Sequence, residues 1–284
     1  MSVAANRLWR LMLAPAGLWL VVFFVAPFSI VIAVSLATTD FLGRPVFGWN
    51  PENYQQVFDP LFIPVLVRSA AFAVAATALC LLIGYPVAYM IARFGGRFRN
   101  FLIVLIILPW FADYLVRIYA WFVILGDQGV VNGLLHAVGF PGDPPVTFIN
   151  TPFAVIGGLV YDFLPFMILP IYAALERMDP SLTEAGKDLY GTPLQTFLHV
   201  TWPATVQGVV AGVVLVGLPA LGDFATAQIL GGPNTYMIGN LIQDQFGSGY
   251  WPFGAALTIV LMAVLSLLMI FYLRSAARPA EASA

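Results

Sequence analysis

Six long apolar segments run through this 284-residue chain and constrain its fold more than any other feature. An α-helix rises about 1.5 Å per residue, so about 20 apolar residues cross the hydrocarbon core of a bilayer. The sequence therefore predicts an all-α, polytopic membrane protein with about six transmembrane helices, forming a single domain over residues 1–284. The predicted spans are Leu11–Leu36, Val65–Ile91, Phe101–Leu125, Pro152–Leu175, Val206–Leu221 (with room to extend to about Leu230) and Pro252–Leu273.

The composition fits a bilayer and argues against other classes of protein. Hydrophobic residues make up 61% of the chain and charged residues 9%, against about 25% charged residues in a soluble domain. The net charge of −2 offers no basic face for nucleic acid. Cys80 is the only cysteine, and no ligand-spaced partners accompany His136 or His199, so we expect neither an intrachain disulfide nor a metal site.

Basic residues predict how the chain is oriented. Arg7 and Arg10 precede the first apolar segment, but that segment is too long for a signal peptide and no cleavage pattern follows before Asp40, so we expect a retained span. Placing both termini in the cytoplasm puts nine of the twelve Lys and Arg residues inside. We therefore expect a multi-pass protein of the bacterial cytoplasmic (inner) membrane with both termini cytoplasmic.

The predicted inner loop over residues 176–204 is long and patterned. Asp179-Pro180 and Thr192-Pro193 are both typical of helix starts, and Gly191 is placed to end the first helix. We expect Pro203 to end the second helix before the fifth span begins. The first helix carries an apolar face formed by Leu182, Ala185 and Leu189, which favours docking into a groove on a partner.

This loop resembles the EAA loop of ABC import permeases. The resemblance is carried by Glu184-Ala185-Gly186, Gly191, Val200, Trp202 and Pro203. Gly186 at the third position, Tyr190 at the usual glycine position and Trp202 in place of leucine depart from the family pattern. The resemblance implies a type I importer permease fold in which this loop is the coupling helix. It implies contact with an ATPase subunit through Glu184, Ala185, Gly186, Lys187, Asp188 and Gly191. The alternative is an ordinary amphipathic connector.

Further stretches resemble the spermidine/putrescine permeases of the PotB type. They include residues 115–120, 158–161, 164–167, 188–189, 194–197, 230–233, 237–240 and 251–254. The resemblance implies import of a polyamine or related organic cation. It also implies three kinds of partner: a second homologous permease, two ATPase copies that bind ATP and Mg²⁺, and a periplasmic or extracellular binding protein. Membrane lipid would surround the chain. The alternative cargo is another small solute, such as an amino-acid derivative.

Charged residues inside predicted spans are candidates for function, because a charge at the bilayer centre costs about 2.5–3.5 kcal/mol on insertion scales. Asp113 and Arg117 are four residues apart and share a helix face, which predicts an ion pair. Asp162 and Asp223 have no evident basic partner in the sequence. Acids and aromatic faces together attract organic cations. We hypothesise a cation path lined by Asp113, Asp162, Asp223, Trp110, Tyr114 and Tyr161. A purely structural ion pair and interfacial aromatic belts are the alternatives.

The chain has no P-loop, because the only Gly-Lys pair, Gly186-Lys187, lacks the preceding glycine and the following Ser or Thr. We expect a non-catalytic subunit without a cofactor of its own, whose energy comes from a separate ATPase. An ion-coupled secondary transporter using Asp113 and Asp162, and a membrane-embedded enzyme, are the rival classes. The few spans and the absence of internal repeats argue against the first.

Overall fold

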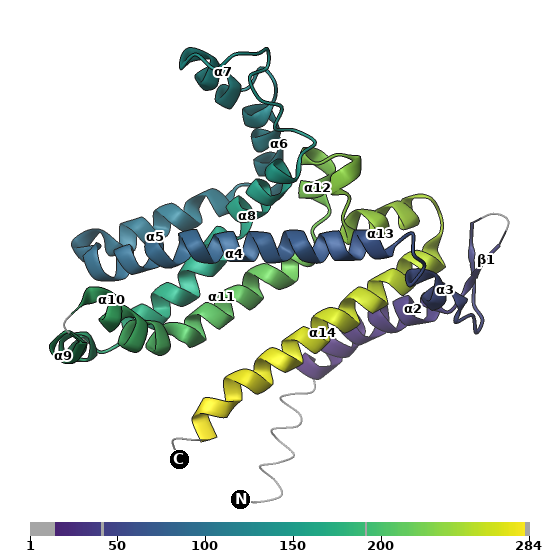
Figure 1. Cartoon of the computed structure of the whole chain (residues 1–284). Helices are drawn as coiled ribbons and strands as arrows, with labels where there is room; N and C mark the ends of the chain where they lie inside the picture. The colour runs from purple at the N-terminus through teal and green to yellow at the C-terminus, as the bar shows by residue number, and fades with distance from the viewer. Residues whose placement is uncertain (1–14, 41–42, 191, 282–284) are drawn as a thin grey trace, which may run out of the picture. The chain divides into compact units, whose positions relative to one another are not determined.

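The computed structural model describes residues 15–40, 43–190 and 192–281 (Figure 1). The predicted helix end at Gly191 and the basic residues Arg7 and Arg10 lie outside these ranges. The contacts divide the chain into two compact units. One comprises Met1–Ile63 and Leu241–Val264, and the other Pro64–Asn240 and Leu265–Ala284. Each unit is described by itself.

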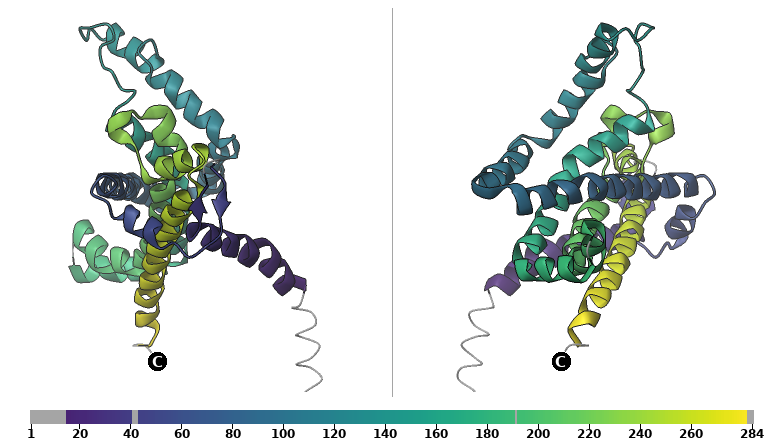
Figure 2. Two further views of the ribbon diagram at one scale, coloured as in Figure 1. Left: turned by 90° about the vertical axis from the view of Figure 1, so that its right-hand side faces the viewer. Right: turned by 60° about the vertical axis from the view of Figure 1, so that its left-hand side comes forward.

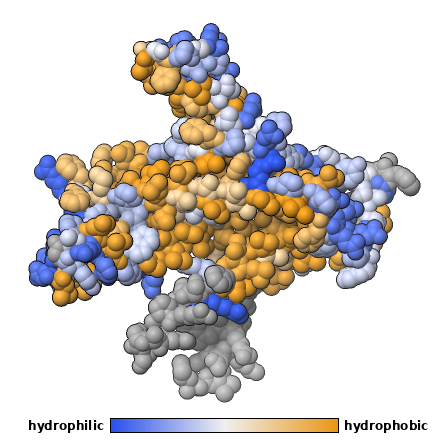
Figure 3. All heavy atoms as spheres, viewed as in Figure 1, coloured by the Kyte–Doolittle hydropathy of each residue, from blue (hydrophilic) through white to orange (hydrophobic). Residues whose placement is uncertain are grey.

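Six helices of the described residues are long and apolar enough to cross a membrane, which confirms the predicted number. They are Pro15–Ser35, Ile63–Phe94, Tyr114–Ala137, Pro152–Arg177, Pro193–Gly222 and Trp251–Ile270. Within the second unit, Figure 3 shows apolar residues over the visible side of α4 (Ile63–Phe94) and hydrophilic residues around α9 (Pro180–Tyr190). This distribution suits a helix in lipid and a loop in water.

In the first unit, hydrogen bonds join the end of the first span to a short helix. The span contains η1 (Val21–Val25) and ends with α2 (Ala26–Ser35). Strands β1 (Thr38–Thr39) and β2 (Pro45–Val46) then pair antiparallel. In α3 (Glu52–Val57), the Asn53 amide donates to the carbonyl oxygens of Ser35 and Ala37, both at 2.9 Å. Carbonyl groups at a helix end have no partner within the helix, so Asn53 completes this end.

The centre of the second unit is the pair α8 (Pro152–Arg177) and α11 (Trp202–Gly222), which lie side by side (Figures 1 and 2). A Cβ added at Gly208 would lie 2.6 Å from the Pro170 carbonyl oxygen, and one added at Gly212 would lie 2.6 Å from Met167 Sδ. The glycines, four residues apart, therefore allow close helix packing.

The third span differs from its prediction. Instead of one helix over Phe101–Leu125, the chain forms α5 (Arg99–Ile107), η3 (Leu108–Phe111) and α6 (Tyr114–Leu125), and Figure 1 shows α5 and α6 pointing in different directions. Ala112 and Asp113 have extended backbones, with ψ of 147° and 139°. The Asp113 carboxylate accepts from the N–H groups of Leu115 and Val116, so the residue begins a new helix inside an apolar run. The span-length segment is Tyr114–Ala137, which includes α7 (Val130–Ala137).

Short elements fill the remaining connections. Between the second and third spans lies η2 (Gly96–Phe98). After α11 the helix stops at Asp223, and the chain continues through α12 (Ala225–Leu230), η5 (Pro233–Thr235) and α13 (Ile238–Gly247) before α14 (Trp251–Glu281). The fifth span therefore does not extend as one helix to Leu230.

Candidate functional site

The first candidate site is α9, the helix that the loop pattern predicted. Asp179 begins it as expected, because its carboxylate Oδ1 accepts the Ser181 N–H at 2.9 Å. The same hydrogen bond lowers the pKa of the exposed Asp179 carboxyl below its ordinary value. The start of this helix is thus fixed by local sequence.

The outer surface of α9 carries most of the residues predicted to contact an ATPase. Glu184, Ala185, Lys187 and Asp188 are exposed, and so are the apolar Leu182 (49%) and Leu189 (79%). Apolar side chains exposed beside charged ones are typical of a surface that docks into a partner's groove.

Gly186, the remaining predicted contact residue within the described part of the loop, is buried and faces inward instead. A Cβ on Gly186 would lie 2.9 Å from both Thr196 Cγ2 and Val200 Cγ2. Tyr190 stacks on His199 with ring centroids 4.8 Å apart. Gly186 therefore lets α9 fold back on the segment that follows it. Sequence reasoning missed Thr196 and His199, because their contacts depend on how this loop folds back.

That following segment corrects the expectation for Pro203. Thr192 begins α10 (Pro193–Thr196) as predicted, but α10 continues through the π-helix η4 (Phe197–Thr201) directly into α11. Pro203 cannot donate a backbone hydrogen bond. The π-helical turn of η4 accommodates the missing donor of Pro203. The Trp202 N–H there donates to the Phe197 carbonyl oxygen, five residues earlier in the chain. A continuous helix therefore joins the loop to the fifth span.

Arginines tie the loop to neighbouring spans of the same unit. In the last turn of α4, Arg93 Nη2 lies 3.4 Å from Thr183 Oγ1 on α9. Arg99 forms a 3.0 Å ion pair with Glu176 and donates to the Ala92 carbonyl oxygen at 3.0 Å. These contacts link α9 and the end of α8 to α4 and α5.

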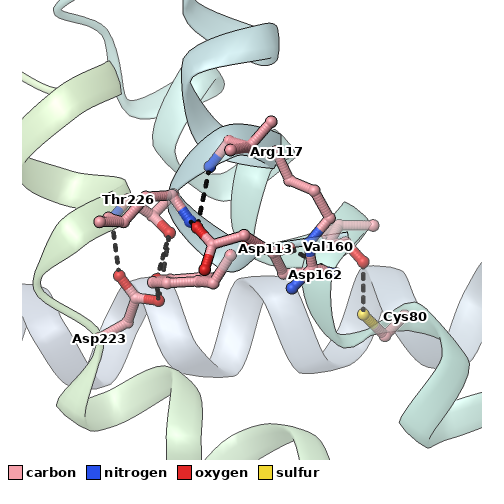
Figure 4. A network of polar contacts seen from close by, with 10 residues as sticks. Cys80, Asp113, Arg117, Val160, Asp162, Asp223 and Thr226 are labelled. Carbon is pink, nitrogen blue, oxygen red and sulfur yellow. Dashed lines mark hydrogen bonds and ion pairs between the residues drawn. The ribbon is translucent and has the colours of Figure 1, made fainter. Parts of the chain in front are cut away.

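The second candidate site is a polar cluster around α6, shown in Figure 4. The predicted ion pair between Asp113 and Arg117 is wrong. Arg117 Nη1 instead lies 3.2 Å from Asp162 Oδ1 on α8, and both side chains are buried. The Asp113 carboxylate instead accepts hydrogen bonds from backbone N–H groups as the cap of α6. It therefore does not form the ion pair with Arg117 that its spacing suggested.

Asp223 receives its hydrogen bonds from neutral donors. The Tyr114 hydroxyl donates to its Oδ2, and Thr226 donates through its N–H at 2.9 Å and its hydroxyl at 3.1 Å. Asp223 is buried, with 8% of its surface exposed, yet it forms no ion pair within the described part of the chain. The Asp-x-x-Thr spacing typical of a helix start could have identified Thr226 from the sequence.

Aromatic rings surround this polar cluster. The Arg117 Cζ atom lies 5.8 Å from the Trp110 ring centroid and 5.9 Å from that of Tyr114, within the range of cation–π contact. Tyr161 packs edge-on against Trp121 at 5.4 Å and is 36% exposed. The structure thus brings Trp110, Tyr114, Arg117, Asp162 and Asp223 together, while Tyr161 faces Trp121.

Comparison with known proteins places the chain in a family. Residues 81–279 match the model of the "Binding-protein-dependent transport system inner membrane component" family. The chain is 40% identical to the spermidine/putrescine transport system permease protein PotB of Haemophilus influenzae, over 97% of this chain and 96% of that protein. PotB of Escherichia coli is 39% identical over 90% of this chain and 94% of its own length.

A solved structure supports the fold. The chain matches one from a bacterial ABC transporter involved in the import of the acidic polysaccharide alginate, with a TM-score of 0.72, 20% identity and 97% coverage of each chain. At this identity the likeness concerns the fold alone. With six apolar helices, a folded-back loop helix and near-complete PotB relatives, the chain belongs to the inner-membrane permease components of binding-protein-dependent ABC importers.

Proposed function

We propose that this permease imports a polyamine, such as putrescine or spermidine, or a related small organic cation. The observation that carries the proposal is 40% identity to a PotB protein over nearly the whole of both chains. The polar cluster supports it, because the buried Asp162 and Asp223 carboxylates accompany the Arg117 guanidinium there, with Asp113 at the start of α6 (Figure 4). Of these, Asp162 and Asp223 are the candidates to meet the cargo, and Asp113 positions α6.

The proposed assembly contains this chain, a second homologous permease, two ATPase copies that bind ATP and Mg²⁺, and an external binding protein. The exposed face of α9 would dock on one ATPase copy, which places that loop and both termini in the cytoplasm. Replacing Glu184 with Ala would remove a charge from this exposed face. We expect ATP hydrolysis to continue while import falls, measured by both rates in proteoliposomes.

Another small solute, such as an amino-acid derivative, is the second candidate cargo. The solved structure is compatible with it, because the same fold there serves import of an acidic polysaccharide and so does not by itself determine the cargo. A secondary transporter is disfavoured by the family match.

Uptake of labelled putrescine and spermidine tests the cargo directly. Cells lacking the gene are compared with cells complemented by the wild-type gene, with amino acids and other small cations as competitors. We expect polyamine uptake to depend on the gene, and complementation to require a functional ATPase subunit. Polyamine uptake that is unchanged by deletion, together with gene-dependent uptake of another solute, would contradict the proposed cargo.

A further inference from the structure

The ion pair between Arg117 and Asp162 is deeply buried but imperfectly bonded. The two side chains are 9% and 4% exposed, and a single contact of 3.2 Å joins Arg117 Nη1 to Asp162 Oδ1 (Figure 4). Neither Arg117 Nε nor Asp162 Oδ1 takes part in a hydrogen bond with the described residues. Strong arginine–carboxylate pairs are commonly bidentate. This pair neutralises charge without using the full bonding capacity of either group.

In such an ion pair, another cation can replace the arginine beside the carboxylate. The desolvation penalty of a buried ion pair roughly cancels its attraction, whereas a buried carboxylate with no cation is strongly disfavoured. Asp162 therefore needs a cation beside it, but the geometry of its contact with Arg117 does not strongly favour a guanidinium over another cation. An ammonium group compensates the same charge, and its three donors suit the oxygen that now lacks a hydrogen bond.

The surroundings offer interaction partners for both cations. Asp223 lies within electrostatic reach of Asp162 and is held by neutral donors only. The Arg117 guanidinium also lies over the Trp110 and Tyr114 rings, 5.8 Å and 5.9 Å from their centroids. A guanidinium displaced from Asp162 can thus keep aromatic contacts, while the entering cation pairs with Asp162 within electrostatic reach of Asp223.

We propose that Arg117 is an internal competitor of the cargo. Its guanidinium neutralises Asp162 in the described conformation, and an ammonium group of the cargo displaces it during passage. This inference rests on the proposed function, namely that the cargo is an organic cation. The competition weakens the hold of the cluster on the cargo, which an importer needs because the cargo must leave on the other side.

Binding of spermidine to the purified, fully assembled importer without its binding protein tests the proposal. Arg117→Gln leaves the Asp162 charge free for the cargo, so we expect about tenfold tighter binding, the lower end of what close charge pairs contribute. Arg117→Lys should give a smaller increase, because its shorter side chain reaches Asp162 less well. The double variant Arg117→Gln/Asp162→Asn, which removes the site together with its competitor, should bind no more tightly than wild type.

A purely structural ion pair predicts the opposite for the single variants. Arg117→Gln would then lower thermal stability and bind spermidine equally or more weakly, and that result in an assembled complex would overturn the proposal. If Arg117→Gln does not assemble, Arg117→Lys decides, and unchanged or weaker binding by it overturns the proposal equally.

Uptake by wild-type proteoliposomes with the binding protein separates this inference from the proposed cargo. If they import no polyamine but Arg117→Gln tightens spermidine binding, the cargo is wrong and the internal competitor stands. If they import polyamine but neither single variant tightens binding, the internal competitor alone is wrong.

Discussion

At the scale of single residues, the partner of each carboxylate in the polar cluster decides what that residue does. Asp113 accepts backbone N–H groups, Asp162 meets a guanidinium, and Asp223 is bonded by neutral donors. Capping needs an acceptor oxygen but no charge, because Asn caps about as well as Asp. Charge is therefore dispensable at Asp113, whereas the proposed function requires it at Asp223, where we expect the cargo cation to be met.

Asp113→Asn and Asp223→Asn form a matched pair of charge-removing variants. We expect Asp223→Asn to lower polyamine uptake about tenfold or more, because a close cation–carboxylate contact contributes at least that much. Asp113→Asn should import near the wild-type rate, because the amide oxygen still caps α6. Uptake per amount of assembled complex gives the comparison. Equal losses in both variants would contradict these separate roles.

Gly208 shows how one missing Cβ sets a helix contact. Gly208→Ala places a methyl group 2.6 Å from the Pro170 carbonyl oxygen and 2.7 Å from Ala174 Cβ. We expect a loss of about 1–3 kcal/mol, typical of overpacking, measured as a lower unfolding temperature of the purified complex. The control is Gly157→Ala in α8, where a Cβ meets nothing within 4 Å. It should be neutral or slightly stabilising, since Ala favours helix.

At the scale of elements, α9 combines a locally determined start with a placement that depends on tertiary contacts. Asp179 fixes the beginning of the helix through its hydrogen bond to Ser181. The contacts of Gly186 and Tyr190 with the α10–η4 segment, and of Arg93 with Thr183, fix where the helix lies. Because η4 continues into α11, the segment that α9 contacts is joined to the fifth span by unbroken helix.

Gly186→Val tests this placement. The added side chain would collide with Thr196 and Val200, which lie 2.9 Å from a Cβ at this position. We expect α9 to shift outward, so that ATP hydrolysis persists while import falls. Adding Val200→Ala makes room and should restore part of the import. The ratio of transported substrate to hydrolysed ATP in proteoliposomes measures both effects, and an unchanged ratio in Gly186→Val would contradict the role of this contact.

The stability that the Asp179 cap gives to α9 should depend on pH. The pKa of Asp179 is lowered in the folded state by its bond to the Ser181 N–H. A lowered pKa means that the capping contribution is present above the ordinary Asp range and is lost as pH falls through the folded-state value. We expect the protection factors of the amides in the first turn of α9, which correct for the intrinsic pH dependence of exchange, to fall only in acid, and Asp179→Asn to remove that step. The same acid response in Asp179→Asn would assign it to another group.

At the scale of the whole molecule, six apolar spans and the basic-residue pattern predict which loops face the cytoplasm. Impermeant maleimide labelling of single cysteines tests this orientation in a Cys80→Ser background. We expect a cysteine at the exposed Glu184 of α9 to react only after the membrane is opened, and one at the exposed Gln55 of α3 to react in intact cells. The reverse pattern would invert the proposed topology.

The sequence by itself determined the number of spans, the α9 and α10 starts and the likeness to importer permeases. Spans depend on local hydropathy, and caps depend on residues within one turn, so neither needs knowledge of distant contacts. The same local signals place Glu184 and its neighbours on the loop helix. The single-domain boundary and the contact residues on a partner stay predictions.

Only the tertiary structure decided the partner of Arg117, the break before α6 and the passage of helix through Pro203. The Arg117 pairing joins α6 to α8, residues 45 positions apart in the chain, and spacing along one helix carries no information about a neighbouring helix. From the sequence Asp113 was predicted to pair with Arg117, but in the fold its carboxylate caps α6 instead. Which faces meet is decided by packing of whole helices, and that packing is a property of the folded chain.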